Sequence, residues 1–155
     1  MKLGIAKLIS TFFGIGYLPY MPGTYGSIAG VVLYYLLRNN IAICWFFVII
    51  IILLGFLASK KAEDIFGKKD PSFVVIDEVA AIMVVLLFAP QTIFFIILSF
   101  LLFRLFDIIK PCPIKKIEQF SGSWGIMLDD LMAAAYAILV IYLVKYIFNY
   151  GGIKW

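Results

Sequence analysis

Five of the nine acidic residues fall into three short groups, Asp77-Glu78, Asp107 and Asp129-Asp130. Carboxylates that converge repel one another unless a cation lies between them. Hard divalent ions bind oxygen ligands, and Mg²⁺ typically takes one or two carboxylates together with water and a substrate phosphate. If the fold brings the groups together, all five residues are candidate metal ligands and candidate catalytic groups, and Mg²⁺ is the expected cofactor. The chain has no histidine, which excludes mechanisms that need an imidazole.

Arg104, Asp107 and Lys110 follow one another at intervals of three residues. On a helix this spacing places them on one broad face. In a functional interpretation, Arg104 and Lys110 bind a phosphate while Asp107 binds a metal. In a structural interpretation, Arg104 pairs locally with Asp107, and Lys110 extends to the lipid headgroups.

A glycine-rich segment, Pro22-Gly23-Thr24-Tyr25-Gly26-Ser27, precedes an apolar run. Glycines and hydroxyls at a helix N-terminus can expose backbone N–H groups to an anion, so Gly23, Thr24, Gly26 and Ser27 are candidate phosphate-binding residues. The structural alternative is a helix start capped by Thr24 or Ser27, with Gly26 and Gly30 as a close-packing face.

The composition indicates that these residues sit in a membrane protein. Of the 155 residues, 65% are hydrophobic and 14% are charged, whereas soluble domains are about 45–50% apolar and about 25% charged. So few polar groups cannot cover the surface of a soluble fold of this size. The net charge of +4 is interpreted as attraction to anionic lipid, and no nucleic-acid-binding module is present.

The apolar runs predict an all-α, integral membrane helical bundle that forms a single domain over residues 1–155. About 20 apolar residues cross a bilayer core. Pro90 interrupts one long run and predicts a helical hairpin that turns there. We expect five spans, or four if the first is re-entrant, at about residues 24–37, 39–59, 73–89, 92–109 and 130–148. Polar loops are expected between 60 and 70 and between 110 and 128, and no signal for an oligomeric state is evident.

Basic residues orient this bundle, because cytoplasmic loops carry an excess of Lys and Arg. With the amino end in the cytoplasm, ten of the 13 basic residues lie on that side: Lys2, Lys7, Lys60, Lys61, Lys68, Lys69, Arg104, Lys110, Lys115 and Lys116. Arg38, Lys145 and Lys154 lie on the other side. The five carboxylates and the glycine-rich segment then share the cytoplasmic face.

Solvated charges at helix ends would explain some of the carboxylates, since acidic groups are favoured at helix N-termini. That account fits Asp77-Glu78 and Asp129-Asp130, which begin predicted spans. It does not fit Asp107, which lies near a helix C-terminus, where a carboxylate is disfavoured.

Four motifs resemble those of the phosphatidylglycerophosphatase A family, which dephosphorylates phosphatidylglycerol phosphate to phosphatidylglycerol. They cover nearly the whole chain, and the last two are the most specific. In order they are Pro22-Gly23-Thr24-x-Gly26-Ser27, Asp77-Glu78, Phe103-Arg104-x-Phe106-Asp107-x-x-Lys110-Pro111-x-Pro113-Ile114, and Gly125-Ile126-Met127-x-Asp129-Asp130.

The resemblance implies a Mg²⁺-dependent lipid phosphatase of the bacterial cytoplasmic membrane that acts in phosphatidylglycerol and cardiolipin synthesis, with its active site on the cytoplasmic face. The expected substrate is phosphatidylglycerol phosphate in a lipid bilayer. Attack by a metal-activated water and a covalent aspartyl-phosphate are both compatible with these residues.

The residues do not fit the motifs of several other enzyme classes. A cysteine phosphatase based on Cys112 needs an arginine at position 118, which is Glu118. The Asp-x-Asp nucleophile motif and the long signature of CDP-alcohol phosphotransferases are absent. The alternative from another class is a small ion or metal transporter, because intramembrane carboxylates mark ion pathways. A pathway needs polar groups across the bilayer, whereas mid-span stretches such as 41–56 and 79–88 have no ionisable group.

Overall fold

The chain folds into a bundle of helices, as a computed structural model of residues 3–68 and 71–150 shows. The described residues form seven α-helices and one short 3-10 helix and contain no strand, which confirms the all-α prediction. In chain order these are α1 (Leu3–Ser10), η1 (Ile15–Tyr17), α2 (Pro22–Leu37), α3 (Ile41–Phe66), α4 (Ile76–Phe88), α5 (Ile93–Ile109), α6 (Ile114–Ile117) and α7 (Ser123–Tyr150).

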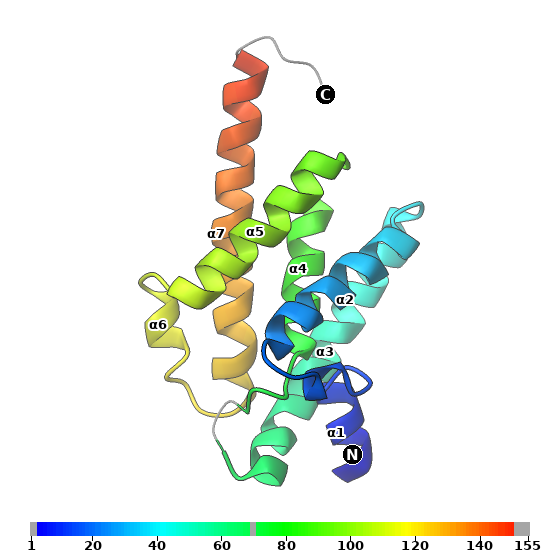
Figure 1. Cartoon of the computed structure of the whole chain (residues 1–155), viewed down its shortest axis with the longest axis vertical. Coiled ribbons are helices and arrows are strands. Elements are labelled where there is room, and N and C mark those ends of the chain that lie inside the picture. Colours follow the sequence, from blue (N-terminus) through cyan, green and yellow to red (C-terminus); the bar gives the residue numbers. More distant parts are fainter. Residues whose placement is uncertain (1–2, 69–70, 151–155) are drawn as a thin grey trace.

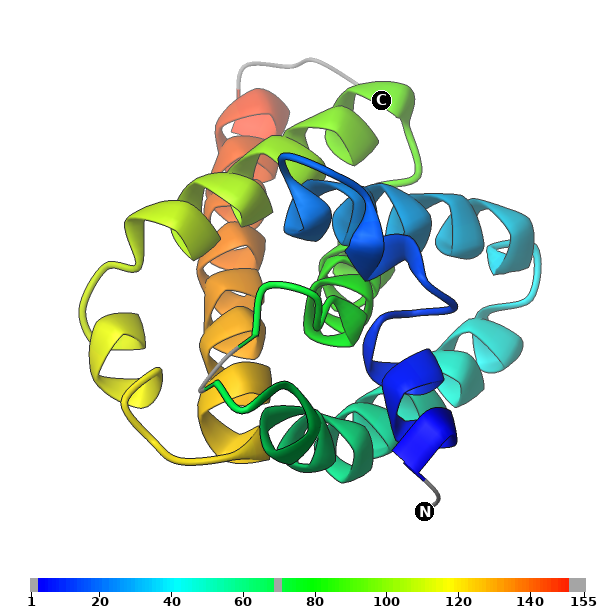
Figure 2. The ribbon, with the colours of Figure 1, turned by 60° about the horizontal axis from the view of Figure 1, so that its bottom comes forward.

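Helix α4 is the centre of the bundle. It contacts α2, α3, α5 and α7, and Figure 2 shows it nearly end-on, in green, with these helices around it. Its sequence is apolar on every side after Asp77 and Glu78, as expected for a buried helix, and nine of its 13 residues are buried. Any group at the start of α4 is therefore held inside the bundle.

Small residues let α2 approach α4 closely. A Cβ added to Gly30 would lie 2.8 Å from the carbonyl oxygen of Val79, and one added to Gly26 would lie 3.0 Å from that of Val75. Both glycines thus pack against the α4 backbone, which confirms the close-packing interpretation of this pair.

Helix α2 begins one turn earlier than the capping interpretation requires. Its first residue is Pro22, a favoured residue at this position because its missing N–H needs no partner there. The Ser27 hydroxyl donates to the Gly23 carbonyl oxygen at 2.9 Å. Thr24 and Ser27 therefore lie inside the helix, and the prediction that one of them caps it is wrong.

Both predicted polar loops are partly helical. Helix α3 continues through Lys60 to Phe66 and ends at Gly67, whose φ of 62° is the left-handed conformation typical of a helix C-terminus. The second loop contains α6, and α7 starts at Ser123. The charges mark where the apolar surface ends, but charged side chains on a helix surface do not end the helix. Consequently Asp129 and Asp130 lie about two turns into α7 and not at its N-terminus.

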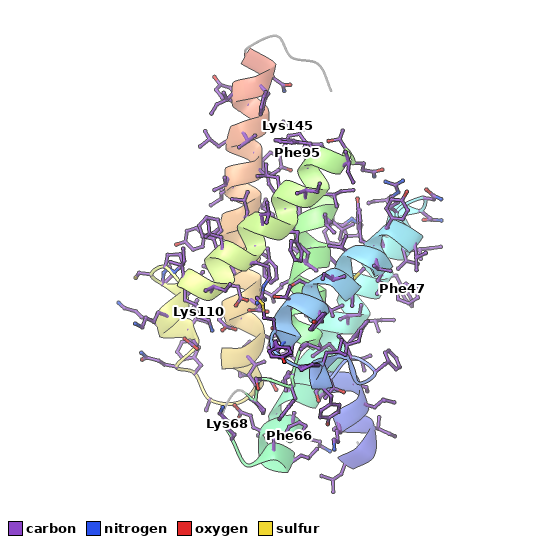
Figure 3. All side chains as sticks on the ribbon, in the orientation of Figure 1. Phe47, Phe66, Lys68, Phe95, Lys110 and Lys145 are labelled. Carbon is purple, nitrogen blue, oxygen red and sulfur yellow. The ribbon has the colours of Figure 1, made fainter. Side chains whose placement is uncertain are left out.

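The expected hairpin at Pro90 is confirmed, because α4 ends at Phe88 and α5 begins at Ile93. The loops also gather as predicted. In Figure 1 α1, α6 and the C-terminal end of α3 lie in the lower half, while the 89–92 turn and the end of α7 lie in the upper half. Figure 3 shows Lys68 at the lower end and Lys145 near the top. Lys2, Lys69 and Lys154 lie outside the described residues.

Two helices, α3 and α7, are long and apolar enough to cross a membrane by length and composition. Helices α2, α4 and α5 are shorter, at 16, 13 and 17 residues. The number of spans, four or five, stays a prediction. The outer faces carry large apolar side chains, including Leu36, Leu53, Leu101, Leu139 and Leu143, each more than half exposed.

The packing of α2 on α4 predicts that Gly30→Ala lowers stability by about 1–3 kcal/mol, as overpacking does, because the Val79 backbone cannot move away. Thermal unfolding of the detergent-purified protein, followed by circular dichroism, measures the effect. Gly4→Ala is the matched control, because no atom lies within 4 Å of its added Cβ. Unfolding of Gly30→Ala at or above the wild-type temperature would contradict the packing.

Candidate active site

A polar cleft of ≈ 330 Å³ opens where α2 and α4 begin, where α5 ends and where α7 completes its first turns. It brings together all five predicted carboxylates, Arg104 and Lys110, which come from α4, from α7 and from the end of α5. The residues that line it are Tyr20, Met21, Pro22, Gly23, Ser72, Val74, Asp77, Glu78, Arg104, Asp107, Ile108, Lys110, Asp129 and Asp130.

Three of the carboxylates form the tightest cluster. One oxygen each of Asp77, Glu78 and Asp130 lies within 4.8 Å of the other two. The first two residues occupy the first turn of α4, and Asp130 faces them from α7. Asp77 and Asp130 are 6% and 4% exposed. This cluster, which we call the acidic triad, is therefore shielded from water on several sides.

The acidic triad has oxygen atoms without partners. Glu78 Oε2 and Asp130 Oδ2 are buried, and no described residue donates a hydrogen bond to either. A buried carboxylate oxygen that lacks a partner is destabilising. A divalent cation would satisfy both oxygens and offset the mutual repulsion of the three groups. The residues present therefore fit Mg²⁺ or a similar hard cation, and Asp77, Glu78 and Asp130 are the ones that would hold it.

Arg104 connects the end of α5 to the triad. Its Nη1 lies 2.6 Å from Asp107 Oδ2 and 3.9 Å from Glu78 Oε1. The local Arg104–Asp107 pair of the structural interpretation is thus present, but the guanidinium also reaches α4. Its Nε is buried and donates to no described residue. Arg104 thus lines the cleft, and one of its five donors has no partner among the described residues.

Lys110 joins α5 to α7, and the prediction that it extends to the headgroups is wrong. Its Nζ lies 2.7 Å from Asp129 Oδ2 and 2.9 Å from Glu118 Oε1. The backbone at Lys110 has a φ of 46°, which ends α5 and turns the chain. Burial alone would lower the pKa of Lys110, but the hydrogen bonds and charges of Asp129 and Glu118 outweigh it and raise the pKa. The ammonium therefore stays protonated. Figure 3 labels Lys110 beside α6 and the lower part of α7.

Gly23 lies against the Arg104–Glu78 pair. An added Cβ would overlap Glu78 Oε1 and would lie 3.1 Å and 3.2 Å from the two Arg104 Nη atoms. Only glycine leaves room for this approach. The N-terminal end of α2 thus forms one wall of the cleft.

The other members of the glycine-rich segment are placed differently. Thr24, Gly26 and Ser27 are not among the residues that line the cleft. Gly26 packs on Val75, and Ser27 is fully buried, with its hydroxyl bonded to the Gly23 carbonyl. Of the four candidate phosphate-binding residues in the segment, the structure brings only Gly23 to the cleft.

Sequence reasoning missed several residues of the site. Glu118, at the C-terminal end of α6, forms an ion pair with Lys110. No regular spacing in the sequence relates Glu118 to the other site residues. Five further residues line the cleft but belong to none of the motifs in the sequence: Tyr20, Met21, Ser72, Val74 and Ile108.

Comparisons with known proteins identify the relatives of this chain. A family model described as Phosphatidylglycerophosphatase A matches residues 8–145. A protein from Bacteroides thetaiotaomicron named "Putative phosphatidylinositol-3-phosphatase" is 37% identical over 149 residues, covering 90% of this chain and 93% of that protein. Proteins named Phosphatidylglycerophosphatase A from Haemophilus influenzae and Escherichia coli are 36% and 28% identical, covering 90% and 88% of this chain and 88% and 81% of theirs. No solved structure matches.

The acidic triad predicts that Asp130→Asn weakens divalent-cation binding at least about tenfold, because second-shell changes alone cost 10- to 100-fold at metal sites. Isothermal titration of the detergent-purified protein with MgCl₂ and MnCl₂ measures the affinity. Asp64→Asn is the matched control, since Asp64 is exposed on α3 and does not line the cleft. Equal affinities for wild type and Asp130→Asn would contradict the assignment.

Proposed function

Because this chain belongs to the phosphatidylglycerophosphatase A family, and is therefore a phosphatase, we propose that it hydrolyses the phosphomonoester of phosphatidylglycerol phosphate with the help of Mg²⁺. The products are phosphatidylglycerol and inorganic phosphate, which places the reaction in phosphatidylglycerol and cardiolipin synthesis. The observation that carries the proposal is the cleft itself. It combines a carboxylate cluster with two unpartnered oxygens and a basic side chain with an unused donor.

The acidic triad is the proposed metal site. When bound there, Mg²⁺ would polarise the phosphoryl oxygens and lower the pKa of a bound water. Asp77 and Glu78 are fixed by the buried start of α4, and Asp130 by α7. Rigid supports of this kind hold ligands in place better than loops do.

Arg104 is the proposed contact for the phosphoryl group. Hydrogen bonds between a guanidinium and a phosphate are charge-assisted and gain strength where water is excluded. Asp107 holds the guanidinium at 2.6 Å, so Asp107 orients Arg104 toward the triad. Gly23 permits this placement because it has no side chain to displace Arg104.

Lys110 has two roles in the proposal. Its ammonium has three donors, and Asp129 and Glu118 accept from two of them. The third can reach a phosphate oxygen at the rim. At the same time Lys110 neutralises Asp129, which lowers the electrostatic barrier that five carboxylates would raise against an anionic substrate.

We further propose that the chain is embedded in the bacterial cytoplasmic membrane with the cleft on the cytoplasmic side. The apolar outer faces of α2, α3, α5 and α7 exceed what a soluble monomer exposes. Most basic residues lie at the cleft end of the bundle, which the positive-inside rule assigns to the cytoplasm. A lipid phosphate at the headgroup level would then meet the cleft directly.

The proposal predicts phosphate release from phosphatidylglycerol phosphate that requires Mg²⁺ and stops with excess EDTA. Asp130→Asn, which removes a proposed metal ligand, and Arg104→Ala are each expected to reduce turnover by about 100-fold or more, as removal of a group that stabilises the transition state does. Phosphate release by the detergent-purified protein measures both effects. Asp64→Asn should keep wild-type turnover. Wild-type turnover in Asp130→Asn, or full activity in EDTA, would contradict the metal-assisted reaction.

An inositol lipid phosphate is the second candidate substrate, because one relative with 37% identity is named for such a phosphatase. Its sugar ring brings several hydroxyls, each of which needs a partner when buried. Among the described residues, Tyr20 and Ser72 are the only uncharged residues with polar side chains that line the cleft.

We therefore expect kcat/KM for phosphatidylglycerol phosphate to exceed that for phosphatidylinositol 3-phosphate by about tenfold or more. Both lipids are presented in the same mixed micelles, and phosphate release is measured under matched Mg²⁺ concentrations. A preference for the inositol lipid would reverse the choice of substrate while leaving the phosphatase chemistry intact.

A further inference from the structure

An apolar groove of ≈ 450 Å³ runs along the outer face of α2. We call it the α2 groove. Helix α2 contributes Tyr25, Ala29, Val32 and Leu36 to it, and the segment before the helix contributes Phe12 and Leu18. These α2 residues recur at intervals of three and four, so they form one continuous stripe on the helix. In Figure 1 the segment before α2 lies against the lower part of that helix.

The α2 groove and the polar cleft are lined by neighbouring residues of the chain. Pro22 lines the cleft, and Tyr25 lines the groove three residues later on the same helix. Leu18 lines the groove, and Tyr20 and Met21 line the cleft just after it. Tyr20 and Met21 are 96% and 55% exposed. A single molecule can therefore extend from the cleft into the groove across the Met21–Pro22 edge.

The length of the groove suits one lipid chain. The helix rises about 1.5 Å per residue, so Tyr25 and Leu36 are about 16 Å apart along its axis. Half of the hydrocarbon core of a bilayer is about 15 Å thick. Helix α2 leads away from the cleft, so a chain in the groove would enter the bilayer to the depth of one leaflet.

Phe12, in one wall of the groove, lies in a segment whose backbone has positive φ values. Phe12 and Phe13 have φ values of 43° and 58°, a conformation that is strained for bulky residues and persists only where the surroundings enforce it. The Thr11 hydroxyl fixes the turn, because it donates to the Lys7 carbonyl at 2.8 Å and accepts from the Gly14 N–H at 3.1 Å. Phe12 is thus held in place as part of a preformed wall.

We propose that the α2 groove binds one acyl chain of the lipid whose phosphate enters the cleft. This inference rests on the proposed function and adds the place where one acyl chain of that lipid lies. The surrounding bilayer is as apolar as the groove, so burial alone gives little driving force. What the groove supplies is orientation: a chain that lies along α2 holds the phosphate at a fixed position beside Arg104 and the acidic triad.

The test is Ala29→Trp, which fills the middle of the groove and changes no residue that lines the cleft. Two substrates are compared, long-chain phosphatidylglycerol phosphate and its deacylated headgroup, which has the same phosphomonoester and no chains. We expect kcat/KM to fall about tenfold for the lipid, the size of a pocket-filling effect, and less than about twofold for the headgroup. Ala135→Trp is the matched control, since Ala135 is exposed on α7 away from the cleft; it should leave both values unchanged.

A second measurement does not depend on catalysis. A phosphatidylglycerol with a diazirine on one acyl chain should photolabel residues 25–36 in the wild type and label them several-fold less in Ala29→Trp. The proposal would be overturned if the exposed face of α7 were labelled as strongly as residues 25–36. It would also be overturned if Ala29→Trp lowered kcat/KM equally for the lipid and for the headgroup. A change in oligomeric state caused by Ala29→Trp, measured by light scattering, would instead identify the groove as a contact between copies and also overturn the proposal. If the wild type hydrolyses neither substrate, the proposed function fails, while photolabelling still decides whether the groove holds a chain.

Discussion

Five carboxylates share one cleft with two basic side chains, and this imbalance of charge governs the site. Arg104 neutralises Asp107, and Lys110 neutralises Asp129. The remaining three are Asp77, Glu78 and Asp130, and no described residue donates a hydrogen bond to Glu78 Oε2 or to Asp130 Oδ2. Buried charge of one sign is unfavourable, so a cation bound in the cleft would lower the repulsion between these carboxylates. A Mg²⁺ ion bound there would have this effect and would also act as a Lewis acid that polarises a phosphoryl oxygen.

The packing of the bundle prevents these carboxylates from moving apart into water. Helix α4 is enclosed by four helices, so its first turn cannot swing Asp77 and Glu78 into water. Gly26 and Gly30 bring α2 onto the α4 backbone, and Gly23 carries the same close approach to the carboxylate of Glu78. The same stripe of small residues that packs two helices therefore also shapes the cleft wall. Close packing and site geometry depend on the same feature of α2.

The ion pairs act between helices more than within them. Arg104 reaches from α5 to α4, and Lys110 reaches from α5 to α7. In an apolar bundle the hydrophobic effect gives little specificity to helix contacts, so these directional contacts set the position of α5 relative to the triad. The apolar stripe on the outer side of α2 takes no part in this network.

The sequence by itself determined the kinds of residue at the site and the end of the bundle where they gather. Apolar runs, Pro90 and the basic residues were sufficient for that, because hydrophobic length and proline act locally. The sequence also marked the five carboxylates, Arg104 and Lys110. Only the tertiary structure decided how they divide: Asp107 and Asp129 against cations, the other three into a triad. It also separated Gly23, at the cleft, from Thr24, Gly26 and Ser27, and it supplied Glu118 as the partner of Lys110. These choices depend on helix rotation and on contacts between segments far apart in the chain, and no local pattern encodes either.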